Sequence, residues 1–308
     1  MFGWWRRRKE RRQLTEKLLF INRNIAPHYH SFPLKKATGG YRTIEAPVEE
    51  LKEAQRLILK RYYYGLECST AAHGFVRGRS ITTCARHHCD RLVVVAVDIK
   101  DFFPSITRDM VEKITRDMVP ELAKNKELFD LVLGAITSND ALPQGSPASP
   151  TLSNLVFNGI DNQLVSLACA FKARYSRYAD DLFFSSRYNR NLPGIISSVE
   201  RILNAHGFSI NRKKVRVMRR GQRQVVAGLI VNGKTPAVGR EQLRSLRAAI
   251  HLLEKELQGA GPQSPSVAKL MESIQGKISF FHMVNPQSVR RLARTFKAIC
   301  RQQAARSS

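Results

Sequence analysis

The sequence predicts an α+β protein, with β-strands in the middle of the chain and helices towards its C-terminal end. Residues 91–98 (RLVVVAVD) form a near-continuous β-branched run, which is typical of a strand buried on both faces. Residues 173–185 place aromatic, β-forming residues on both sides of Tyr178-Ala179-Asp180-Asp181, the pattern of a β-hairpin with an acidic tip. From Val238 onward the composition changes to helical segments.

The composition indicates a folded protein with a polyanionic partner. The chain has 308 residues, of which 43% are hydrophobic, enough for a substantial core and roughly two or three subdomains. Lys and Arg number 51 against 25 Asp and Glu, which gives a formal net charge of +26. An excess of this size favours nucleic acid as the partner, with an anionic membrane surface as the alternative.

The sequence also bears on the compartment. No apolar run approaches the roughly 20 residues that span a bilayer, and the N-terminus shows no signal-peptide apolar core. The five cysteines are odd in number and contain no C-x-x-C pair, which argues against a disulfide framework. We therefore expect a cytoplasmic protein with no membrane partner.

Two basic segments open the chain. The run Arg6–Arg12 is followed by apolar residues at helical spacing, which predicts a basic helix. We interpret it as an RNA-backbone clamp; a solvated helix face and a membrane-surface helix are the alternatives. Lys35–Ile44 predicts a hairpin around Gly39-Gly40. Its cations Lys36 and Arg42 suit a triphosphate, with a solvated basic turn as the alternative.

A helix is expected at Glu49–Tyr64, and a glycine-punctuated loop, His73–Ser80, then presents Arg77 and Arg79. The following segment, Cys84–Cys89 (CARHHC), is dense enough in Cys and His to raise the question of zinc. Its spacing matches no common structural zinc pattern, so we expect buried thiols with polar histidines.

Three carboxylates are the candidate chemical centre. Asp98 ends the buried strand, and Asp180 and Asp181 form the hairpin tip. Adjacent carboxylates repel each other unless a cation neutralises them, and magnesium is a hard cation that prefers such oxygens. Together they could hold two metals roughly 3.5–4 Å apart for in-line phosphoryl transfer. The alternative is that Asp98 caps the strand and the other two make a turn.

The remaining segments predict further elements. Leu142–Pro150 is a rigid loop from which Gln144 could project towards a base or sugar. In the first C-terminal helix, Arg240, Arg244 and Arg247 share one face, which suits contacts to a nucleic-acid backbone. We predict helices at Thr107–Met118, Thr151–Leu167, Pro193–His206 and Arg240–Leu257, strands at Phe208–Val217 and Gln224–Val231, and a turn at Asn232-Gly233.

Taken together, these residues resemble the reverse transcriptases, and more closely their bacterial retron-type members. The matching motifs, in order, are His73-Gly74-Phe75 with Gly78-Arg79-Ser80, Asp98-Ile99-Lys100-Asp101-Phe102-Phe103, Leu142-Pro143-Gln144-Gly145 with Ser146-Pro147, Tyr178-Ala179-Asp180-Asp181, Asn211-x-x-Lys214 and Ala227-Gly228-Leu229. Two shorter elements resemble retron enzymes in particular: Cys84-Ala85-Arg86-His87-His88, with Cys in place of Asn, and Val226-Ala227-Gly228, with Ala in place of Thr.

The resemblance implies a right-hand polymerase fold with fingers, a palm made of an antiparallel sheet packed on helices, and a helical thumb. The implied boundaries are 1–34 for a basic N-terminal helical extension, 35–90 for the fingers, 91–235 for the palm with a fingers insertion near 108–140, and 236–308 for the thumb.

It also implies residue roles. Asp98 and Asp180 would ligate two Mg²⁺ ions, or Mn²⁺ as a substitute, with the Ile99 carbonyl assisting and Asp181 completing the acidic cluster. One ion would lower the pKa of the primer hydroxyl, and the other would neutralise the triphosphate. The implied nucleotide contacts are Lys36 and Arg42 to phosphates, Gln144 to the base or sugar, Phe103 as a gate against the ribose 2′-hydroxyl, and Lys214 as the proton donor to the leaving group. The implied nucleic-acid contacts are Arg77, Arg79, Arg86, His88, Gly228, Arg240, Arg244 and Arg247.

The function that the resemblance implies is that of a retron polymerase. It would copy a structured noncoding RNA into RNA-linked multicopy single-stranded DNA, starting from an internal 2′-hydroxyl. Its partners would be that cognate RNA, the DNA product, deoxynucleoside triphosphates and a separate effector protein of an antiphage defence system. The alternatives are another stand-alone bacterial reverse transcriptase (intron-like, abortive-infection or untemplated) and a non-catalytic RNA-binding scaffold.

Overall fold

The computed structural model describes residues 12–21, 28–35, 39–188, 191–259 and 264–306. Most of the basic run Arg6–Arg12, and Lys36 in the predicted hairpin, lie outside these ranges. Residues 12–21 are helical, as predicted, and bury Leu14, Leu18 and Ile21 against the main core. The first helix is therefore amphipathic and packed on the protein.

A four-stranded antiparallel sheet forms the centre of the molecule, in the order β4-β5-β3-β6. Along β3 the side chains alternate between the two faces of the sheet. Val93, Val95 and Val97 pack into one core, whereas Val94 and Ala96 pack into another. The predicted strand is thus buried on both faces because each face has its own covering layer. The strands are β3 (Val93–Asp98), β4 (Arg174–Tyr178), β5 (Asp181–Ser186) and β6 (Arg216–Arg219).

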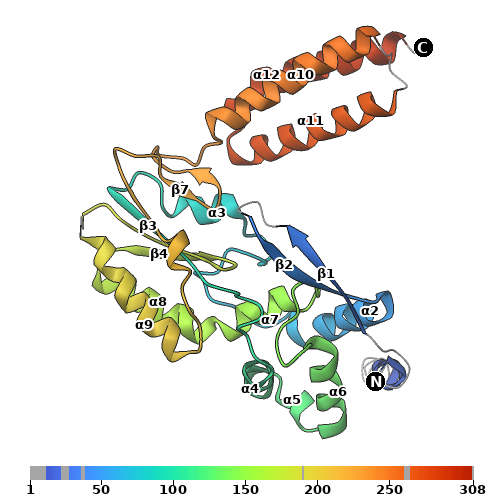
Figure 1. Ribbon diagram of the computed structural model, residues 1–308, viewed down its shortest axis with the longest axis vertical. Coiled ribbons are helices and arrows are strands. Elements are labelled where there is room, and N and C mark those ends of the chain that lie inside the picture. The colour runs from blue at the N-terminus through green and yellow to red at the C-terminus, as the bar shows by residue number, and fades with distance from the viewer. Residues whose placement is uncertain (1–11, 22–27, 36–38, 189–190, 260–263, 307–308) are drawn as a thin grey trace, which may run out of the picture.

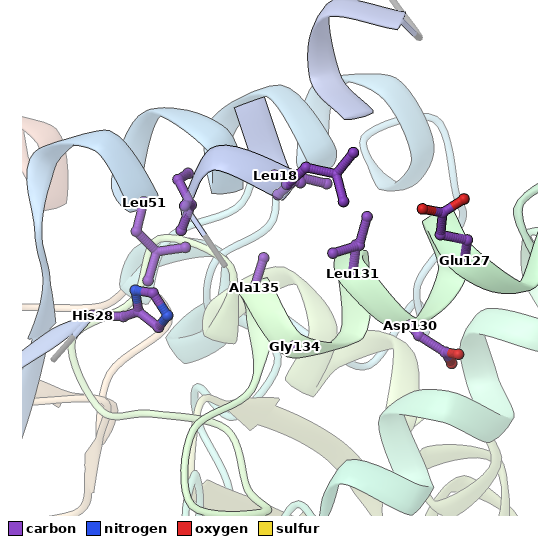
Figure 2. A pocket seen from close by; sticks show the side chains of 10 residues that line it. Leu18, His28, Leu51, Glu127, Asp130, Leu131, Gly134 and Ala135 are labelled. Carbon is purple, nitrogen blue, oxygen red and sulfur yellow. The ribbon is translucent and has the colours of Figure 1, made fainter. Parts of the chain in front are cut away.

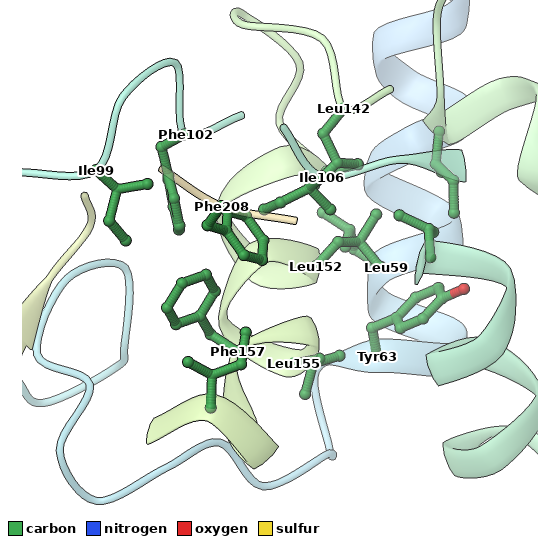
Figure 3. Packing of buried hydrophobic residues seen from close by; sticks show 14 of the residues in the cluster. Leu59, Tyr63, Ile99, Phe102, Ile106, Leu142, Leu152, Leu155, Phe157 and Phe208 are labelled. Carbon is green, nitrogen blue, oxygen red and sulfur yellow. The ribbon is translucent and has the colours of Figure 1, made fainter. Parts of the chain in front are cut away.

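Helices cover one face of the sheet. They are α7 (Ser149–Val156), α8 (Asn158–Ala170) and α9 (Ile195–Ala205), the last preceded by the short turn η2 (Leu192–Gly194). The helix predicted at Thr151–Leu167 is in fact two helices, which meet at Phe157. The Phe157 ring is buried against Phe102 and Phe208, with centroid distances of 5.2 and 4.9 Å. Figure 3 shows these rings pointing towards one another beside Ile99.

The other face carries α3 (Ile81–Arg86) and a small hairpin made of β7 (Val225–Val226) and β8 (Leu229–Ile230). The prediction of one strand over residues 224–231 is therefore wrong. Ala227 and Gly228 have φ values of 46° and 82°, left-handed conformations that reverse the chain in a two-residue turn. The predicted basic strand is also shorter than expected, because Arg212–Lys214 form a 3₁₀ turn (η3) before β6.

The predicted N-terminal hairpin consists of β1 (Tyr29–Lys35) and β2 (Tyr41–Pro47), which are antiparallel. The next predicted helix is α2 (Glu49–Ile58), which continues as a π-helical segment, η1 (Leu59–Tyr63). Three further helices lie at the far end of the molecule from the C-terminus in Figure 1: α4 (Arg108–Met118), α5 (Pro120–Ala123) and α6 (Lys126–Ile136).

Three long helices end the chain: α10 (Arg240–Gly259), α11 (Pro265–Val284) and α12 (Pro286–Arg306). They form a bundle that projects beyond the sheet (Figure 1). Leu246, Ile250 and Phe296 are among the buried side chains that fill the interior of this bundle. Within the described ranges, no helix is both long enough and apolar enough to cross a membrane.

Candidate active site

Two strands and one turn bring three carboxylates together. Asp98, at the end of β3, is the register partner of Asp181, the first residue of β5. Asp180 occupies the turn between β4 and β5, and its backbone carbonyl accepts a hydrogen bond from the Ile99 N–H at 3.0 Å. The end of the buried strand and the tip of the acidic hairpin therefore lie side by side, as expected.

The acidic turn makes close contact with the loop that begins at His73. Ala179, the first turn residue, has a φ of 55°. A Cβ on Gly74 would lie 2.6 Å from the Ala179 backbone nitrogen, closer than real contacts allow. Only glycine lets the loop approach this turn so closely.

The charges of the site influence one another. Burial, followed by the charges of Asp180 and Asp98, raises the pKa of Asp181 from 3.8 to about 6. Burial is also the main cause that raises the pKa of Asp180. The Nζ atom of Lys214 lies 2.8 Å from Asp98 Oδ2, and this hydrogen bond raises the pKa of the lysine. The site concentrates negative charge that a cation would stabilise.

The donor set suits a hard divalent cation. Carboxylate oxygens and a backbone carbonyl are the ligands that magnesium prefers, and a cation would relieve the repulsion among the acids. In the described part of the chain, no three His, Cys, Asp or Glu side chains already enclose a metal position, and Asp98 is paired with Lys214. Asp98, Asp180 and Asp181 therefore suit such a cation by the chemistry of their oxygens.

Two predicted nucleotide contacts, Arg42 and Gln144, are linked through β2. Arg42 on β2 is exposed, and its charge opposes the raised pKa of Asp180. The loop of Gln144 reaches the same hairpin, because the Gln144 carbonyl accepts a hydrogen bond from the Glu45 N–H at 2.9 Å. A Cβ on Gly145, whose φ is 138°, would lie 2.7 Å from the Glu45 carbonyl oxygen. Glycine therefore allows the loop to pack against β2.

The predicted gate, Phe103, is half-buried on the segment that follows Asp98. Its ring centroid lies 5.4 Å from that of Phe102, which is part of the core, and 6.3 Å from that of Phe75, which is about half exposed. These contacts place the Phe103 ring between the core and the loop that touches the acidic turn.

The predicted nucleic-acid contacts differ in exposure. Arg77, Arg86 and Gly228 are exposed. Arg79 instead donates to the backbone carbonyls of Ser69, at 2.7 Å, and Ala72, so its guanidinium holds its own loop together. On α10 the exposed residues include Arg240, Arg244 and Arg247.

His88 is fully buried, which is inconsistent with the predicted contact to nucleic acid. Its two ring nitrogens lie 2.7 Å from the hydroxyls of Ser185 on β5 and Ser176 on β4. Burial holds the pKa of His88 well below its usual value, so the ring is neutral. It links the two strands of the acidic hairpin from inside. Cys84 and Cys89 are buried, as predicted.

Sequence reasoning missed a buried ion pair beside the acidic turn. The side chains of Arg177 on β4 and Asp161 on α8 have no exposed surface, and their charged groups lie 2.8 Å apart. No local pattern signals this pair, because β4 also carries Arg174 and α8 also carries Asn162 and Gln163.

A pocket of about 390 Å³ lies elsewhere, between the helix of residues 12–21 and α6. Its walls include Leu18, Leu51 and Leu131, with His28 at one end and Asp130 towards the other (Figure 2). None of the predicted site residues lines it.

Comparison with known proteins identifies the family that the chain matches. Residues 34–252 match the family described as reverse transcriptase (RNA-dependent DNA polymerase). The chain is 38% identical over 292 residues to the Retron Mx162 reverse transcriptase and 36% identical over 284 residues to the Retron Mx65 reverse transcriptase, both of Myxococcus xanthus. These matches cover 85% and 88% of this chain, but only 59% and 64% of the relatives. The chain thus spans less than two thirds of either relative.

Among solved structures, a telomerase from Candida albicans in complex with a TWJ fragment of telomeric RNA has a TM-score of 0.50 and 11% identity, over 89% of this chain and 56% of that chain. At this identity the likeness concerns the fold alone. With the family match, it confirms the expected α+β right-hand polymerase fold.

Proposed function

This chain belongs to the reverse transcriptase family, as a retron-type member, and we propose that it is an RNA-directed DNA polymerase. One observation carries the proposal: Asp98 and Asp181 are register partners on β3 and β5, with Asp180 in the adjoining turn. Such an acidic cluster at the edge of a sheet, in a protein with a net charge of +26, suits nucleotidyl transfer on a nucleic acid.

We assign the cofactor site to this cluster. Asp98, Asp180 and the Ile99 carbonyl would hold Mg²⁺, for which Mn²⁺ could substitute, and Asp181 would complete the negative field around it. When bound, two such ions supply Lewis-acid stabilisation of the attacking and leaving oxygens. A metal-free protein should keep its fold, because the core beneath Asp98 is formed by packed aromatic rings.

The surrounding side chains would bind and orient the nucleotide. Arg42, whose charge acts on Asp180, would hold the phosphates, and we propose the same role for Lys36 because it is a second cation on the same segment of the sequence. Gln144 would contact the base or sugar, and Phe103 would exclude the ribose 2′-hydroxyl. Lys214, whose pKa is raised by Asp98, keeps a proton that it could give to the leaving group.

The nucleic acid would lie across the palm, with contacts from exposed cations of the fingers and thumb. Arg77 and Arg86 on the fingers side and the Arg240, Arg244, Arg247 face of α10 suit phosphate binding. We retain residues 1–34, 35–90, 91–235 and 236–308 as the proposed extension, fingers, palm and thumb, with the fingers insertion near 108–140.

We further propose that the template is a structured noncoding RNA, as the retron names of the relatives suggest. The chain would copy it in the cytoplasm into RNA-linked multicopy single-stranded DNA, and a separate effector protein would use the product in antiphage defence. An internal 2′-hydroxyl can prime synthesis only if folded RNA holds that ribose against Asp98 and Asp180.

The proposal can be tested in cells. The chain is expressed with its neighbouring genomic DNA, copurifying nucleic acid is sequenced, and the DNA is treated with a debranching enzyme. We expect one RNA-linked DNA species whose mobility changes after debranching. DNA with an ordinary 3′-primed start would place the chain among the other stand-alone reverse transcriptases. Bound RNA without any DNA would instead favour a scaffold.

A further inference from the structure

We propose that Arg177 is a positioning residue, which holds the turn of Asp180 and Asp181 in place from the interior of the protein. The expected loss of polymerase rate rests on the proposed function, whereas the expected loosening of the turn rests on the packing of Arg177 alone. Arg177 lies on β4, two residues before Ala179, where the turn begins. Its side chain has no exposed surface. A guanidinium is among the groups that proteins rarely bury fully.

Three acceptor groups from separate elements surround this guanidinium. The Asp161 carboxylate on α8 accepts from Nη2 at 2.8 Å and from Nε at 3.0 Å. Nη1 donates to Asn154 Oδ1 on α7 at 3.0 Å and to the Ala179 backbone carbonyl at 3.3 Å. The guanidinium also lies over the Phe157 ring, 4.8 Å from its centroid, and Figure 3 shows that ring within the core.

The bond to Ala179 acts on the turn itself. The Ala179 carbonyl belongs to the peptide group that joins it to Asp180, so the bond fixes the orientation of that peptide. Ala179 has a φ of 55°, which is unfavourable for an L-residue and needs support from its surroundings. Asn154 provides a second link, because its Nδ2 donates at 2.9 Å to the carbonyl of Gly74, the residue that packs against Ala179.

The backbone of Arg177 is fixed as well. Its N–H donates to the Ala71 carbonyl at 2.8 Å, and its carbonyl accepts from the His73 N–H at 2.7 Å. These bonds fix the position of the Arg177 backbone, from which the side chain extends to the Ala179 carbonyl. Arg177 therefore ties the acidic turn to α7, to α8 and to the neighbouring loop at once.

Stability alone is a weak reason for this pair. Burying two charges opposes their attraction, and apolar residues of similar volume often replace a buried ion pair without loss of stability. Apolar residues cannot supply a donor aimed at the Ala179 carbonyl. Lysine cannot replace arginine either, because its ammonium lacks the planar fork that serves several acceptors in fixed directions. We infer that the geometry of the turn depends on Arg177 more than the stability of the fold does.

Two variants separate geometry from stability. Arg177→Lys keeps the charge but cannot serve all three acceptors. The triple variant Asp161→Leu/Tyr175→Phe/Arg177→Met removes the buried polar groups together, since the Tyr175 hydroxyl also donates to Asp161 at 2.7 Å. Leu133→Ala is the matched control, because Leu133 is fully buried on α6 and its truncation destabilises the core without a change at the turn. The thermal unfolding midpoint is measured for each full-length chain.

The first readout is hydrogen exchange of the peptides that cover residues 174–186, which requires no activity. The second is the rate of single-nucleotide addition on an RNA template, with the nucleotide KM and RNA affinity measured in parallel. We expect at least about tenfold faster exchange at the turn in both Arg177 variants, together with roughly 10²-fold slower addition at nearly unchanged RNA affinity. Leu133→Ala should resemble the wild type in both readouts.

Turn exchange at the wild-type rate in folded Arg177 variants would overturn the proposal. An equal loss of rate in Leu133→Ala would also overturn it, because Arg177 would then act through stability. The same holds if both Arg177 variants fail to fold where Leu133→Ala folds. A wild-type chain that adds no nucleotide would refute the proposed function, and the exchange readout would still decide whether Arg177 holds the turn.

Discussion

Asp98 and Asp181 are register partners on the adjacent antiparallel strands β3 and β5. Two carboxylates in this relationship destabilise a sheet unless a cation neutralises them. Burial first, and then the charges of Asp180 and Asp98, raise the pKa of Asp181 to about 6. The three carboxylates thus lower the stability of the metal-free fold and favour the binding of a cation.

Replacement of Asp181 should change the free energy of unfolding by an amount that depends on pH. A carboxyl with a higher pKa in the folded state binds more protons when folded, so its contribution to stability falls as the pH rises from about 4 through 6. In metal-free buffer, Asp181→Asn should raise the free energy of unfolding by roughly 1–3 kcal/mol at pH 7.5 and hardly at all at pH 4. Denaturant unfolding at both pH values checks this. An equal gain at the two pH values would rule out the electrostatic explanation.

Lys214 should affect the rate of chemistry more than binding. Its ammonium lies 2.8 Å from Asp98 Oδ2, at the edge of the acidic cluster. Lys214→Ala should slow nucleotide addition by roughly 10²-fold, the usual contribution of a positioned general acid, at nearly unchanged RNA affinity. The neighbouring exposed Lys213 in the same 3₁₀ turn provides the control Lys213→Ala. Equal rates for the two alanine variants would remove Lys214 from the mechanism.

Phe103 should control the choice of sugar. Its half-buried ring packs near the rings of Phe102 and Phe75, on the segment that follows Asp98. Phe103→Ala should reduce discrimination against ribonucleotides by about tenfold or more, because the steric exclusion of the 2′-hydroxyl is lost. Phe103→Tyr keeps the ring and should keep the discrimination. Incorporation assays with paired ribo- and deoxynucleotides measure the ratio, and an unchanged ratio in Phe103→Ala would locate the gate elsewhere.

The thumb should contribute to the salt dependence of RNA binding. Arg240, Arg244 and Arg247 are exposed on α10, and each phosphate contact releases about one counterion. Replacing all three by Gln should lower the slope of log affinity against log salt by about two to three. The matched control replaces three exposed arginines of α12, Arg290, Arg294 and Arg301, by Gln. A larger loss of slope in the control would assign the contact to α12 instead.

Local patterns predicted the elements that carry the acidic cluster. The β-branched run at 91–98 and the aromatic flanks of the acidic turn each specify a strand, and their alternation indicates which faces are buried. The acids could be located because Asp98 ends a strand and Asp180 and Asp181 stand at the tip of the hairpin. The reversal at Ala227-Gly228 was missed because the run of seven residues Val225–Val231, which contains no charged or polar side chain, is equally consistent with one strand or with two short ones.

Side-chain direction could not be predicted from the sequence in the same way. His87 and His88 are adjacent, and only the docking of α3 on the sheet decides which of them is buried between Ser176 and Ser185. Arg177 reads as a surface residue, because arginine is mostly exposed. It is buried only because α8 brings Asp161 to it, a contact between elements that no local pattern reports.

The central claim is that the cluster of Asp98, Asp180 and Asp181 polymerises DNA on an RNA template. The direct measurement is primer extension on a generic RNA template with Mg²⁺ and deoxynucleotides, by the wild-type chain and by Asp180→Asn, with RNA affinity determined for both. We predict extension by the wild type, and a loss of roughly 10³-fold or more in Asp180→Asn at nearly unchanged RNA affinity. Undiminished synthesis by Asp180→Asn, or RNA binding without synthesis by the wild type, would contradict the claim.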